Sequence, residues 1–324
     1  QRQMCIRDSR YITCINADIS DADSNLGIVT ARGNWKGKTK GGLVRTCDNF
    51  KTFDRIGMPF GINAEIDRKL HEIENPNVNA GWVAMSPDGV NIVWSVADGI
   101  RLPVELVLVS NDGGHSFQKA GVFDLAGQPV ETGYLKVFSD RSRKDLFYGF
   151  GGASEIYVSR DGGRNFYQKQ PKEAFPVCDF GYIDTANKTE VRGEGGKTGI
   201  FYLALGDAGL YKLCYDTKTE EIHVKRLTDT GDACYRMGLG VIGEDRDYLT
   251  EEKAIYFCGR LEGEYGFYRT FDEGKSYERL NQDNQMYGEI NSIDGDKRKF
   301  GRFFLATGSR GVLYGEMKRQ SRKI

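Results

Sequence analysis

Short segments in which apolar and polar residues alternate recur along this 324-residue chain, separated by turns rich in Gly, Asp and Ser. The stretches WVAMSPDGVNIVWSV, YLKVFSDRSRKDLFYGF and INSIDGDKRKFGRFFLAT each give strand, polar turn and strand at a period of two residues. A third short strand follows each pair, namely LVLVS, IYVS and GVLYG. No long helical pattern competes with this alternation, so we predict an all-β protein.

One motif follows most of the third strands: Ser or Thr, any residue, Asp, any residue, Gly, any residue, a small polar residue and an aromatic. It is complete at Ser110–Phe117, Ser159–Phe166 and Thr270–Tyr277, weaker at Thr46–Phe53, and eroded from Cys214 onwards. Its aligned Asp residues stand at 48, 112, 161, 216 and 272, so the motif returns every 49 to 64 residues. Six units, beginning near residues 11, 80, 130, 175, 235 and 288, predict a β-propeller of four-stranded antiparallel blades.

We interpret the repeated motif, an Asp box, as a tight turn between the third and fourth strands of a blade. Its glycines can adopt the positive φ that such a turn needs, and its Asp can accept backbone N–H bonds across the turn. A catalytic Asp would be expected once in the chain, whereas this one is repeated. The predicted structural Asp-box residues are Asp48, Asp112, Asp161 and Asp272.

Composition narrows the possible partners and cofactors. The formal net charge is −1, with basic residues scattered, so neither a nucleic-acid nor a membrane partner is expected. No CxxC pair occurs among the seven Cys, and we interpret them as mostly free thiols. The acidic stretch DADSNLG resembles the start of a calcium loop, but Leu26 and Arg32 occupy the positions where that loop needs Gly and Glu. We therefore predict a solvated turn there, no metal site and no cofactor.

The two ends of the chain differ from the repeats. Residues 1–9, QRQMCIRDS, fit neither a signal peptide nor a strand and resemble translated sequencing-adapter sequence at the end of a metagenomic gene. We expect residues 1–9 to be spurious or disordered, residues 10–316 to form the propeller domain, and residues 317–324 to be a charged tail. On this interpretation the gene extends upstream of residue 10.

The stretch from Ala254 to Glu316 carries a family resemblance. The segments GEYGFYRT, RLNQDNQMYG and GDKRKFGRFFLATGSRGVLYGE closely resemble the end of glycoside hydrolase family 74, the xyloglucan-degrading enzymes. The family has Pro where this chain has Lys297, and usually a His in the loop that here carries Asn284 and Gln285. The chain is therefore similar to a divergent member, and the resemblance weakens towards the middle of the sequence.

The resemblance implies two seven-bladed propellers that face each other across a polysaccharide cleft. The family's inverting endo-β-1,4-glucanases use one catalytic Asp from each propeller. This chain resembles the C-terminal, second propeller, whose Asp would lie upstream of Arg10, so no catalytic residue is assigned. It would form one wall of the cleft, with the N-terminal propeller as its partner in cis, and alone we expect it to be inactive. The same resemblance implies a secreted or cell-surface protein that binds xyloglucan or a related β-glucan.

Aromatic and acidic residues in the loops opposite the Asp boxes are candidates for sugar binding. They could stack on sugar rings and hydrogen-bond to hydroxyl groups, although blade packing explains each of them too. The candidates are Trp35, Phe60, Tyr235, Tyr265, Tyr287, Asp207 and Asp283. A non-catalytic propeller that docks proteins or glycans is the alternative function. A sialidase fits poorly, because sialidases carry an early Arg-Ile-Pro motif. The nearest match in this chain, DRIG at Asp54–Gly57, lacks the Pro.

Overall fold

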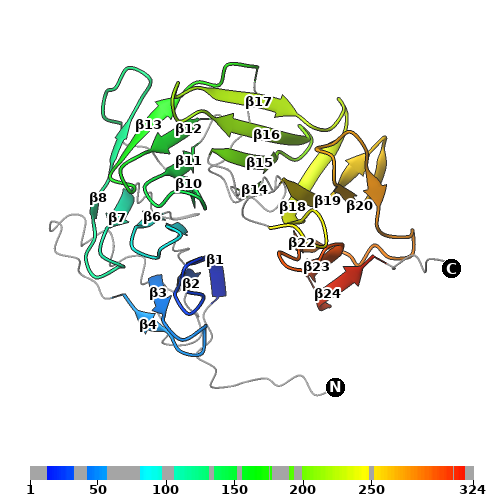
Figure 1. Ribbon diagram of the computed structural model, residues 1–324, viewed down its shortest axis with the longest axis horizontal. Coiled ribbons are helices and arrows are strands. Elements are labelled where there is room, and N and C mark those ends of the chain that lie inside the picture. Colours follow the sequence, from blue (N-terminus) through cyan, green and yellow to red (C-terminus); the bar gives the residue numbers. More distant parts are fainter. Residues whose placement is uncertain are drawn as a thin grey trace. The chain divides into compact units, whose positions relative to one another are not determined.

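The strands of the chain form a series of small sheets. The computed structural model describes residues 13–32, 42–56, 81–96, 106–130, 135–151, 155–174, 176, 190–192, 199–247, 252–308 and 310–317. Within these ranges all regular structure is β-strand, in six sheets whose order follows the predicted repeats (Figure 1). Contacts divide the chain near residue 170 into two compact units, with three sheets in each. The predicted class, repeated four-stranded antiparallel sheets, is confirmed.

The first unit contains strands β1 to β13. Its first two sheets have the strand orders β1-β2-β3-β4 and β5-β6-β7-β8, and its third contains β10-β11-β12-β13. The bounds are β1 (Thr13–Ile19), β2 (Gly27–Arg32), β3 (Gly42–Thr46), β4 (Asp54–Arg55), β5 (Trp82–Met85), β6 (Ile92–Val96), β7 (Leu106–Ser110), β8 (Gln118–Lys119), β10 (Lys136–Ser139), β11 (Phe147–Phe150), β12 (Ile156–Ser159) and β13 (Asn165–Lys169).

The second unit contains strands β14 to β24. Its sheets have the orders β14-β15-β16-β17, β18-β19-β20-β21 and β22-β23-β24. The bounds are β14 (Glu190–Arg192), β15 (Ile200–Ala204), β16 (Leu210–Tyr215), β17 (Ile222–Arg226), β18 (Ala233–Val241), β19 (Lys253–Leu261), β20 (Glu264–Thr270), β21 (Glu278–Arg279), β22 (Ile290–Gly295), β23 (Arg302–Thr307) and β24 (Gly311–Glu316). Among the described residues, the last sheet has three strands.

One sheet departs from the predicted four strands. The segment β9 (Gly121–Phe123) follows β8 directly, leaves the second sheet and pairs in parallel with β13 of the third. Phe123 stacks on Tyr167 of β13, with ring centroids 4.9 Å apart. A similar parallel bridge joins Pro171, just after β13, to Ile222 of β17. After the fourth strands β8 and β13, the chain thus runs beside the fourth strand of the next sheet. The alternation of apolar and polar residues within single strands could not predict this pairing.

The Asp boxes form turns held by hydrogen bonds within each box. In the third sheet, Asp161 Oδ1 accepts hydrogen bonds from the Ser159 hydroxyl at 2.9 Å and the Asn165 N–H at 3.0 Å. The Ser159 oxygen in turn accepts the Gly163 N–H at 3.0 Å. Asp48, Asp112 and Asp272 accept the corresponding backbone bonds. In the eroded copy, Asp216 still accepts the N–H groups of two residues in the β16–β17 turn.

Backbone conformation explains the glycine of the box. Gly163 has a φ of 91°, and a Cβ there would lie 2.3 Å from Val93 Cγ2 of the neighbouring sheet. A side chain at this position would therefore meet both backbone strain and a steric clash. The weaker first copy has Phe50 in the glycine position, and it too takes a left-handed φ of 62°. The turn geometry is retained where the glycine has been lost.

Neighbouring boxes of the first unit are hydrogen-bonded in sequence. The guanidinium of Arg45, just before the first box, donates to Gly113 O in the second box at 2.9 Å. The side-chain amide of Asn111 in the second box donates to Gly162 O in the third at 3.0 Å. The three boxes of this unit therefore lie along one edge of their sheets.

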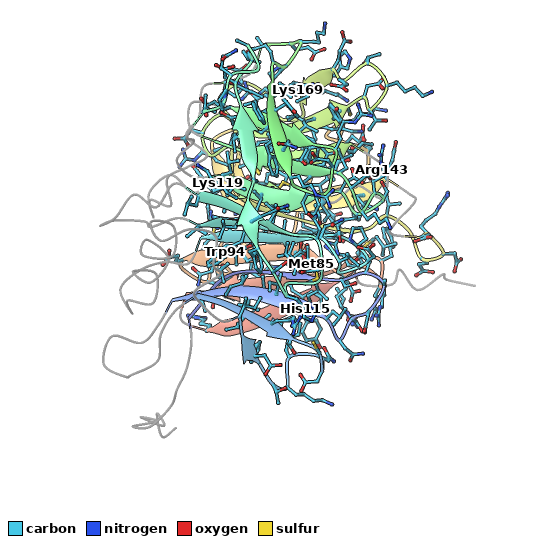
Figure 2. The ribbon with its side chains drawn as sticks, turned by 90° about the vertical axis from the view of Figure 1, so that its left-hand side faces the viewer. Met85, Trp94, His115, Lys119, Arg143 and Lys169 are labelled. Carbon is cyan, nitrogen blue, oxygen red and sulfur yellow. The ribbon has the colours of Figure 1, made fainter. Side chains whose placement is uncertain are left out.

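Apolar side chains fill the spaces between consecutive sheets of a unit. Trp94, which is labelled in Figure 2, is fully buried. It packs edge-on against Phe117 in a cluster with Ile28 and Leu43 of the first sheet. Phe117 closes the second box, so the aromatic residue that ends a box fills the space towards the preceding sheet. Phe166 does the same between the second and third sheets. Burial of this area supplies most of the driving force for packing.

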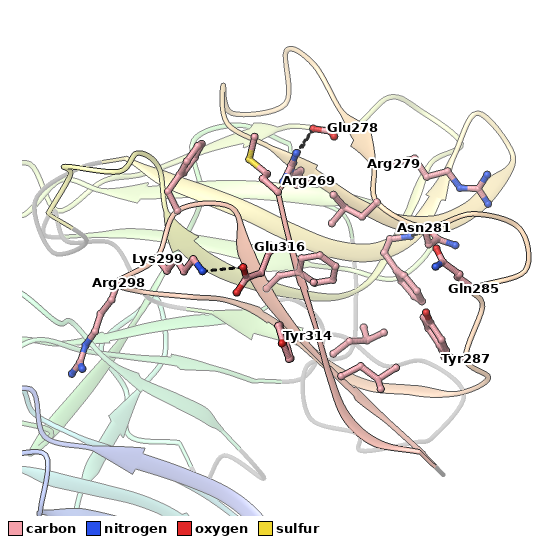
Figure 3. Close-up of a pocket in the computed structure, with 18 of the residues that line it drawn as sticks. Arg269, Glu278, Arg279, Asn281, Gln285, Tyr287, Arg298, Lys299, Tyr314 and Glu316 are labelled. Atoms are coloured by element: carbon pink, nitrogen blue, oxygen red, sulfur yellow. Dashed lines mark hydrogen bonds and ion pairs between the residues drawn. The ribbon is translucent and has the colours of Figure 1, made fainter. Parts of the chain in front are cut away.

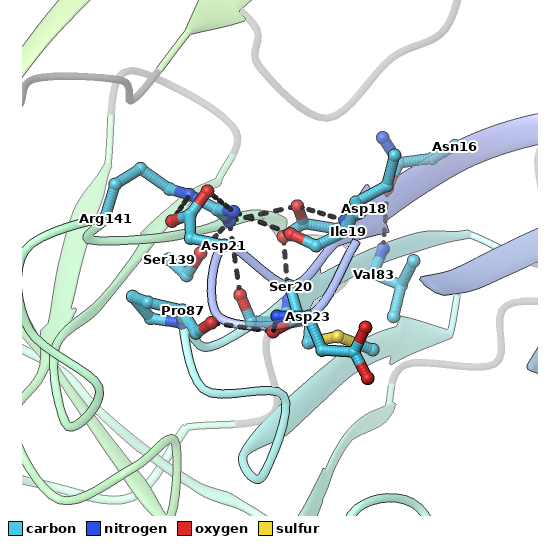
Figure 4. Close-up of polar contacts among 11 residues, drawn as sticks. Asn16, Asp18, Ile19, Ser20, Asp21, Asp23, Val83, Pro87, Ser139 and Arg141 are labelled. Carbon is cyan, nitrogen blue, oxygen red and sulfur yellow. Dashed lines mark hydrogen bonds and ion pairs between the residues drawn. The ribbon is translucent and has the colours of Figure 1, made fainter. Parts of the chain in front are cut away.

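An arginine joins the three sheets of the first unit. Arg141, in the β10–β11 turn, forms ion pairs with Asp18 at 3.1 Å and Asp21 at 2.8 Å in the first sheet and the turn that follows β1 (Figure 4). Its guanidinium also donates to Met85 O of the second sheet and to the Ser139 hydroxyl of its own. Asp21 belongs to the acidic stretch predicted to be a turn, and that stretch does form the β1–β2 turn.

The boxes predict loss of stability in acid. The Thr52 hydroxyl lowers the pKa of Asp48, and the Ser276 hydroxyl lowers that of Asp272, each from 3.8 to about 2. Because the pKa of each carboxyl is lower in the folded state than in the unfolded state, the ionised carboxylates stabilise the fold. This stabilisation is fully present above pH 3.8 and is lost as the pH falls towards about 2. We expect the urea midpoint to fall through this window, and Ser276→Ala to weaken the dependence. A midpoint that does not change between pH 5 and about 2 would contradict the effect.

Candidate functional site

In the second unit, five of the seven candidate residues lie opposite the boxes, either in loops or near the start of strands. These loops join the second strand of a sheet to the third, or one sheet to the next. Asp207, Tyr235, Tyr265, Asp283 and Tyr287 are all among the described residues. Trp35 and Phe60 lie outside them, so their placement stays a prediction.

Asp207 and Tyr235 are brought together across two sheets. Asp207 is exposed in the β15–β16 loop, and Tyr235 is half-buried near the start of β18. The Tyr235 hydroxyl donates to Asp207 Oδ1 at 3.1 Å. Paired backbone bonds of 2.8 Å between Gly206 and Cys234 hold the two elements in register. Burial and the hydrogen bond to the Asp207 carboxylate raise the pKa of Tyr235 above its ordinary value.

Tyr265 contributes more to packing than the sequence suggested. It is half-buried at the start of β20, and its ring packs edge-on to Phe267 in the core between the last two sheets. Its hydroxyl lies 2.9 Å from Cys258 Sγ. Burial, followed by the neighbouring Cys258, raises the pKa of Tyr265. Its ring and hydroxyl are therefore both engaged by the protein.

Asp283 belongs to a charged network centred on Arg279. The Arg279 guanidinium, in β21, forms ion pairs with Glu264 at 2.5 Å and with Asp283 at 2.9 Å. It also donates to Tyr265 O at 3.2 Å. Asp283 has a side chain that is 87% exposed, so its carboxylate faces solvent while one oxygen is paired. Sequence reasoning missed Arg279, since nothing in the pattern marks this arginine apart from its place directly after a box.

Tyr287 presents a ring supported from one side. Its backbone has a φ of 53°, and its ring lies parallel to that of Phe267 with centroids 6.3 Å apart. The Arg310 guanidinium lies 6.0 Å from the same ring. Asn281, buried at the start of this loop, accepts the Phe267 N–H at 2.7 Å and so ties the loop to β20 (Figure 3). Arg310 and Asn281 are further residues that the sequence pattern did not indicate.

The electrostatics of the carboxyl groups do not resemble those of a general acid. A general acid that works near neutral pH needs a raised pKa. Among the described residues, every Asp or Glu whose pKa departs clearly from its ordinary value has a lowered pKa. In most cases the main cause is a hydrogen bond, as for Asp145 beside Arg143 and for Asp216, which accepts the Lys218 N–H. The same residues contain no group of three or more potential metal ligands, and no helix long and apolar enough to cross a membrane. What the loops offer is half-exposed tyrosines beside carboxylates and guanidinium groups.

Sequence and structure comparisons point to one family. The fold matches the crystal structure of the family 74 xyloglucanase from Xanthomonas campestris, with a TM-score of 0.66 and 20% identity, over 94% of this chain and 37% of that one. The sequence is 33% identical over 238 residues to a xyloglucanase of Paenibacillus sp, covering 73% of this chain and 20% of that protein. The chain is a relative of the glycoside hydrolase family 74 xyloglucanases. The family predicted from the C-terminal motifs is therefore confirmed.

Another family 74 relative differs in its named specificity. The chain is 27% identical over 254 residues to an oligoxyloglucan-reducing end-specific xyloglucanase of Emericella nidulans, covering 76% of this chain and 29% of that protein. The chain thus spans between a fifth and a third of the length of these two relatives. No protein-family model matches the chain.

Proposed function

We propose that this chain is the C-terminal propeller of a xyloglucan-degrading, inverting endo-β-1,4-glucanase, secreted or at the cell surface, and that it forms one wall of the polysaccharide cleft. The observation that carries the proposal is the 33% identity to a xyloglucanase over 238 residues, which extend through most of the chain. The half-exposed tyrosines and carboxylates of the second unit are compatible with stacking on sugar rings and hydrogen bonding to hydroxyl groups.

The proposal assigns binding, and not bond cleavage, to the isolated chain. An inverting enzyme needs an acid and a base about 6.5–9.5 Å apart with a water between them. We infer from the family resemblance that both carboxylates belong outside residues 10–324, one of them in an N-terminal propeller that acts as the partner in cis. The described residues give no carboxyl with a raised pKa that would argue otherwise.

We expect the purified chain to bind xyloglucan weakly and to release no reducing ends from it. Affinity electrophoresis in xyloglucan gels measures the binding, and a reducing-sugar assay measures the release of reducing ends. Tyr235→Ala removes the phenol that is hydrogen-bonded to Asp207, so we expect it to abolish most of the retardation. Tyr167→Ala is the matched control, because that tyrosine is 46% exposed and lies on β13, which is not part of these loops.

Two results would count against the proposal. Reducing-sugar release that disappears when one of the chain's own carboxylates is replaced would show that this chain carries its own active site. Unretarded migration in xyloglucan, with binding to another glycan or to a protein instead, would favour the non-catalytic interaction propeller.

A further inference from the structure

A short segment of the second unit, residues 171–173, lies along β17, the outer strand of its sheet. Pro171 forms a parallel bridge with Ile222, and the Lys172 N–H donates to Ile222 O at 2.9 Å. Since β17 pairs with β16 on its other side, these contacts use a backbone group on the edge of the sheet that would otherwise be open to another strand. We call residues 171–173 the strap.

Side chains add a second set of contacts between the strap and β17. The Glu173 carboxylate accepts the Val224 N–H through Oε2 at 2.6 Å, and its Oε1 lies 3.0 Å from His223 Nδ1. Lys172 forms an ion pair with Glu221 at 2.7 Å, and the second oxygen of Glu221 lies 3.9 Å from His223 Nε2. Each ring nitrogen of His223 therefore faces a carboxylate, one from the strap and one from the residue just before β17.

Charges of both signs surround His223. The titratable and charged groups around it are Lys172 and Glu173 of the strap, Glu221 and Lys225 of the chain along β17, Cys214 and Lys212 of β16, and Glu273 of the box that begins at Thr270. Lys172 pairs with Glu221, and Lys212 pairs with Glu273, so these charges largely offset each other. Burial raises the pKa of the Cys214 thiol, which lies directly opposite His223 in the β16–β17 pair. Glu173 is therefore the charged group that acts on His223 most directly.

Both members of the His223–Glu173 pair can titrate. The hydrogen bond from His223, followed by that from the Val224 N–H, lowers the pKa of Glu173 from its ordinary 4.5. Because the pKa of Glu173 is lower in the folded state, its ionised carboxylate stabilises the strap contacts fully above pH 4.5. Histidine side chains as a class change charge between about pH 5 and 8. The two groups are therefore oppositely charged near pH 5, whereas near pH 8 the carboxylate alone carries a charge.

A comparable segment in the first unit is held without titratable groups. Strand β9 runs parallel to β13, the Gly121 N–H donates to Arg164 O at 2.8 Å, and the Phe123 ring stacks on Tyr167. Neither β9, with the sequence GVF, nor β13, with NFYQK, contains His, Asp or Glu. The two segments both run beside a fourth strand, but only the strap is held there by an acid and a base.

We propose that residues 171–173 are a pH-sensitive strap, which covers the outer edge of β17 more tightly when His223 is protonated than when its imidazole is neutral. Protonation turns the contact with Glu173 into an ion pair, so the edge of the sheet opens more readily as the pH rises from about 5 to 8. The side chains of His223 and Glu173 are 51% and 46% exposed, so solvent screens the pair and limits the effect to a few-fold. The proposal does not rest on sugar binding by the loops.

Hydrogen exchange measured amide by amide tests the strap. We expect the protection factor of the Val224 amide, which corrects for intrinsic exchange at each pH, to be roughly two- to fivefold higher at pH 5 than at pH 8. The Lys172 amide should change in the same direction, because it donates from the strap to Ile222 O. The Gly121 amide of β9 is the internal control, and its protection factor should be the same at the two pH values.

Two variants remove one charge each and retain hydrogen-bonding groups. His223→Gln keeps a side-chain N–H donor, and Glu173→Gln keeps an acceptor oxygen. Each should give a Val224 protection factor that no longer differs between pH 5 and pH 8. His115→Gln is the matched control and should retain the original dependence, because the His115 ring contacts Asp112 O within the second box. Circular dichroism and thermal melting at both pH values confirm that the variants fold.

Three outcomes would overturn the proposal. The first is a Val224 protection factor that is equal at pH 5 and pH 8 in the unaltered chain. The second is a dependence that persists in both His223→Gln and Glu173→Gln, since other groups would then cause it. The third is a change of the same size at Gly121, which would mean that pH acts on both units and not on the strap.

Discussion

Arg141→Met should lower the free energy of unfolding of the chain by about 3 kcal/mol, since it removes one member of a partly buried charge cluster. The Arg141 side chain is 14% exposed and pairs with Asp18 and Asp21, whose own side chains are 22% and 34% exposed. Methionine retains most of the apolar stem but none of the donors. Two carboxylates would then repel each other near the Met85 carbonyl, which also loses its donor. Urea unfolding followed by tryptophan fluorescence measures the change.

A second arginine in the same turn provides the control. Arg143 pairs with Asp145 at 2.5 Å, but the two side chains are 35% and 40% exposed. Solvent screens such a pair, so Arg143→Met should cost less than about 1 kcal/mol. If the two variants lost equal free energies of unfolding, the contacts of Arg141 with three sheets would stabilise the chain no more than an ordinary surface ion pair does. Asp18 also accepts the Met85 N–H at 2.8 Å, so Asp18→Ala should be at least as damaging as Arg141→Met.

Asp161→Ala should destabilise the chain by about 2 kcal/mol, because three donors lose their acceptor. Those donors are the Ser159 hydroxyl, the Asn165 N–H and the Asn165 side-chain amide, at 2.9, 3.0 and 2.7 Å. A hydrogen bond to a charged group contributes roughly 1.5–3 kcal/mol, and part of the loss is recovered when water reaches the turn. Thermal and urea denaturation measure the loss of stability. Faster hydrogen exchange of the Asn165 amide would show that the loss arises in this turn.

The eroded copy of the box gives the matched comparison. Asp216 occupies the same position in the repeat and accepts the Lys218 and Thr219 N–H groups at 2.7 and 3.3 Å, without the small hydroxyl residue two positions earlier. Asp216→Ala should therefore move the unfolding midpoint less than Asp161→Ala does. A larger shift at Asp216 would show that the complete motif is not what stabilises these turns.

The repeat and its turns were predictable because both are local. Period-two alternation specifies which side chains face a sheet interface, and a Gly in a fixed place specifies where a left-handed residue is tolerated. The third strands LVLVS and IYVS, which precede the second and third boxes, were predicted with the bounds that the structure gives them. The parallel addition of β9 to β13 was not, since the pairing joins segments of two different sheets.

The candidate site was less accessible from sequence. An aromatic residue in a loop can face solvent or fill a core, and the pattern does not distinguish these alternatives. Tyr235 remains half-exposed with its hydroxyl on Asp207, whereas Tyr265 uses its ring and hydroxyl within the protein. Arg279 and Arg310 gain their positions from residues that lie elsewhere in the chain, so no local spacing marks them.

The sequence by itself determined the class of fold, the six units, the box turns and the family, because each rests on short-range patterns or on similarity along the chain. The tertiary structure alone decided which side chains meet. It placed Arg141 where it contacts three sheets, and it paired Tyr235 with Asp207. The physical reason is that these contacts join residues from different sheets, and burial and charge pairing there depend on how the sheets pack.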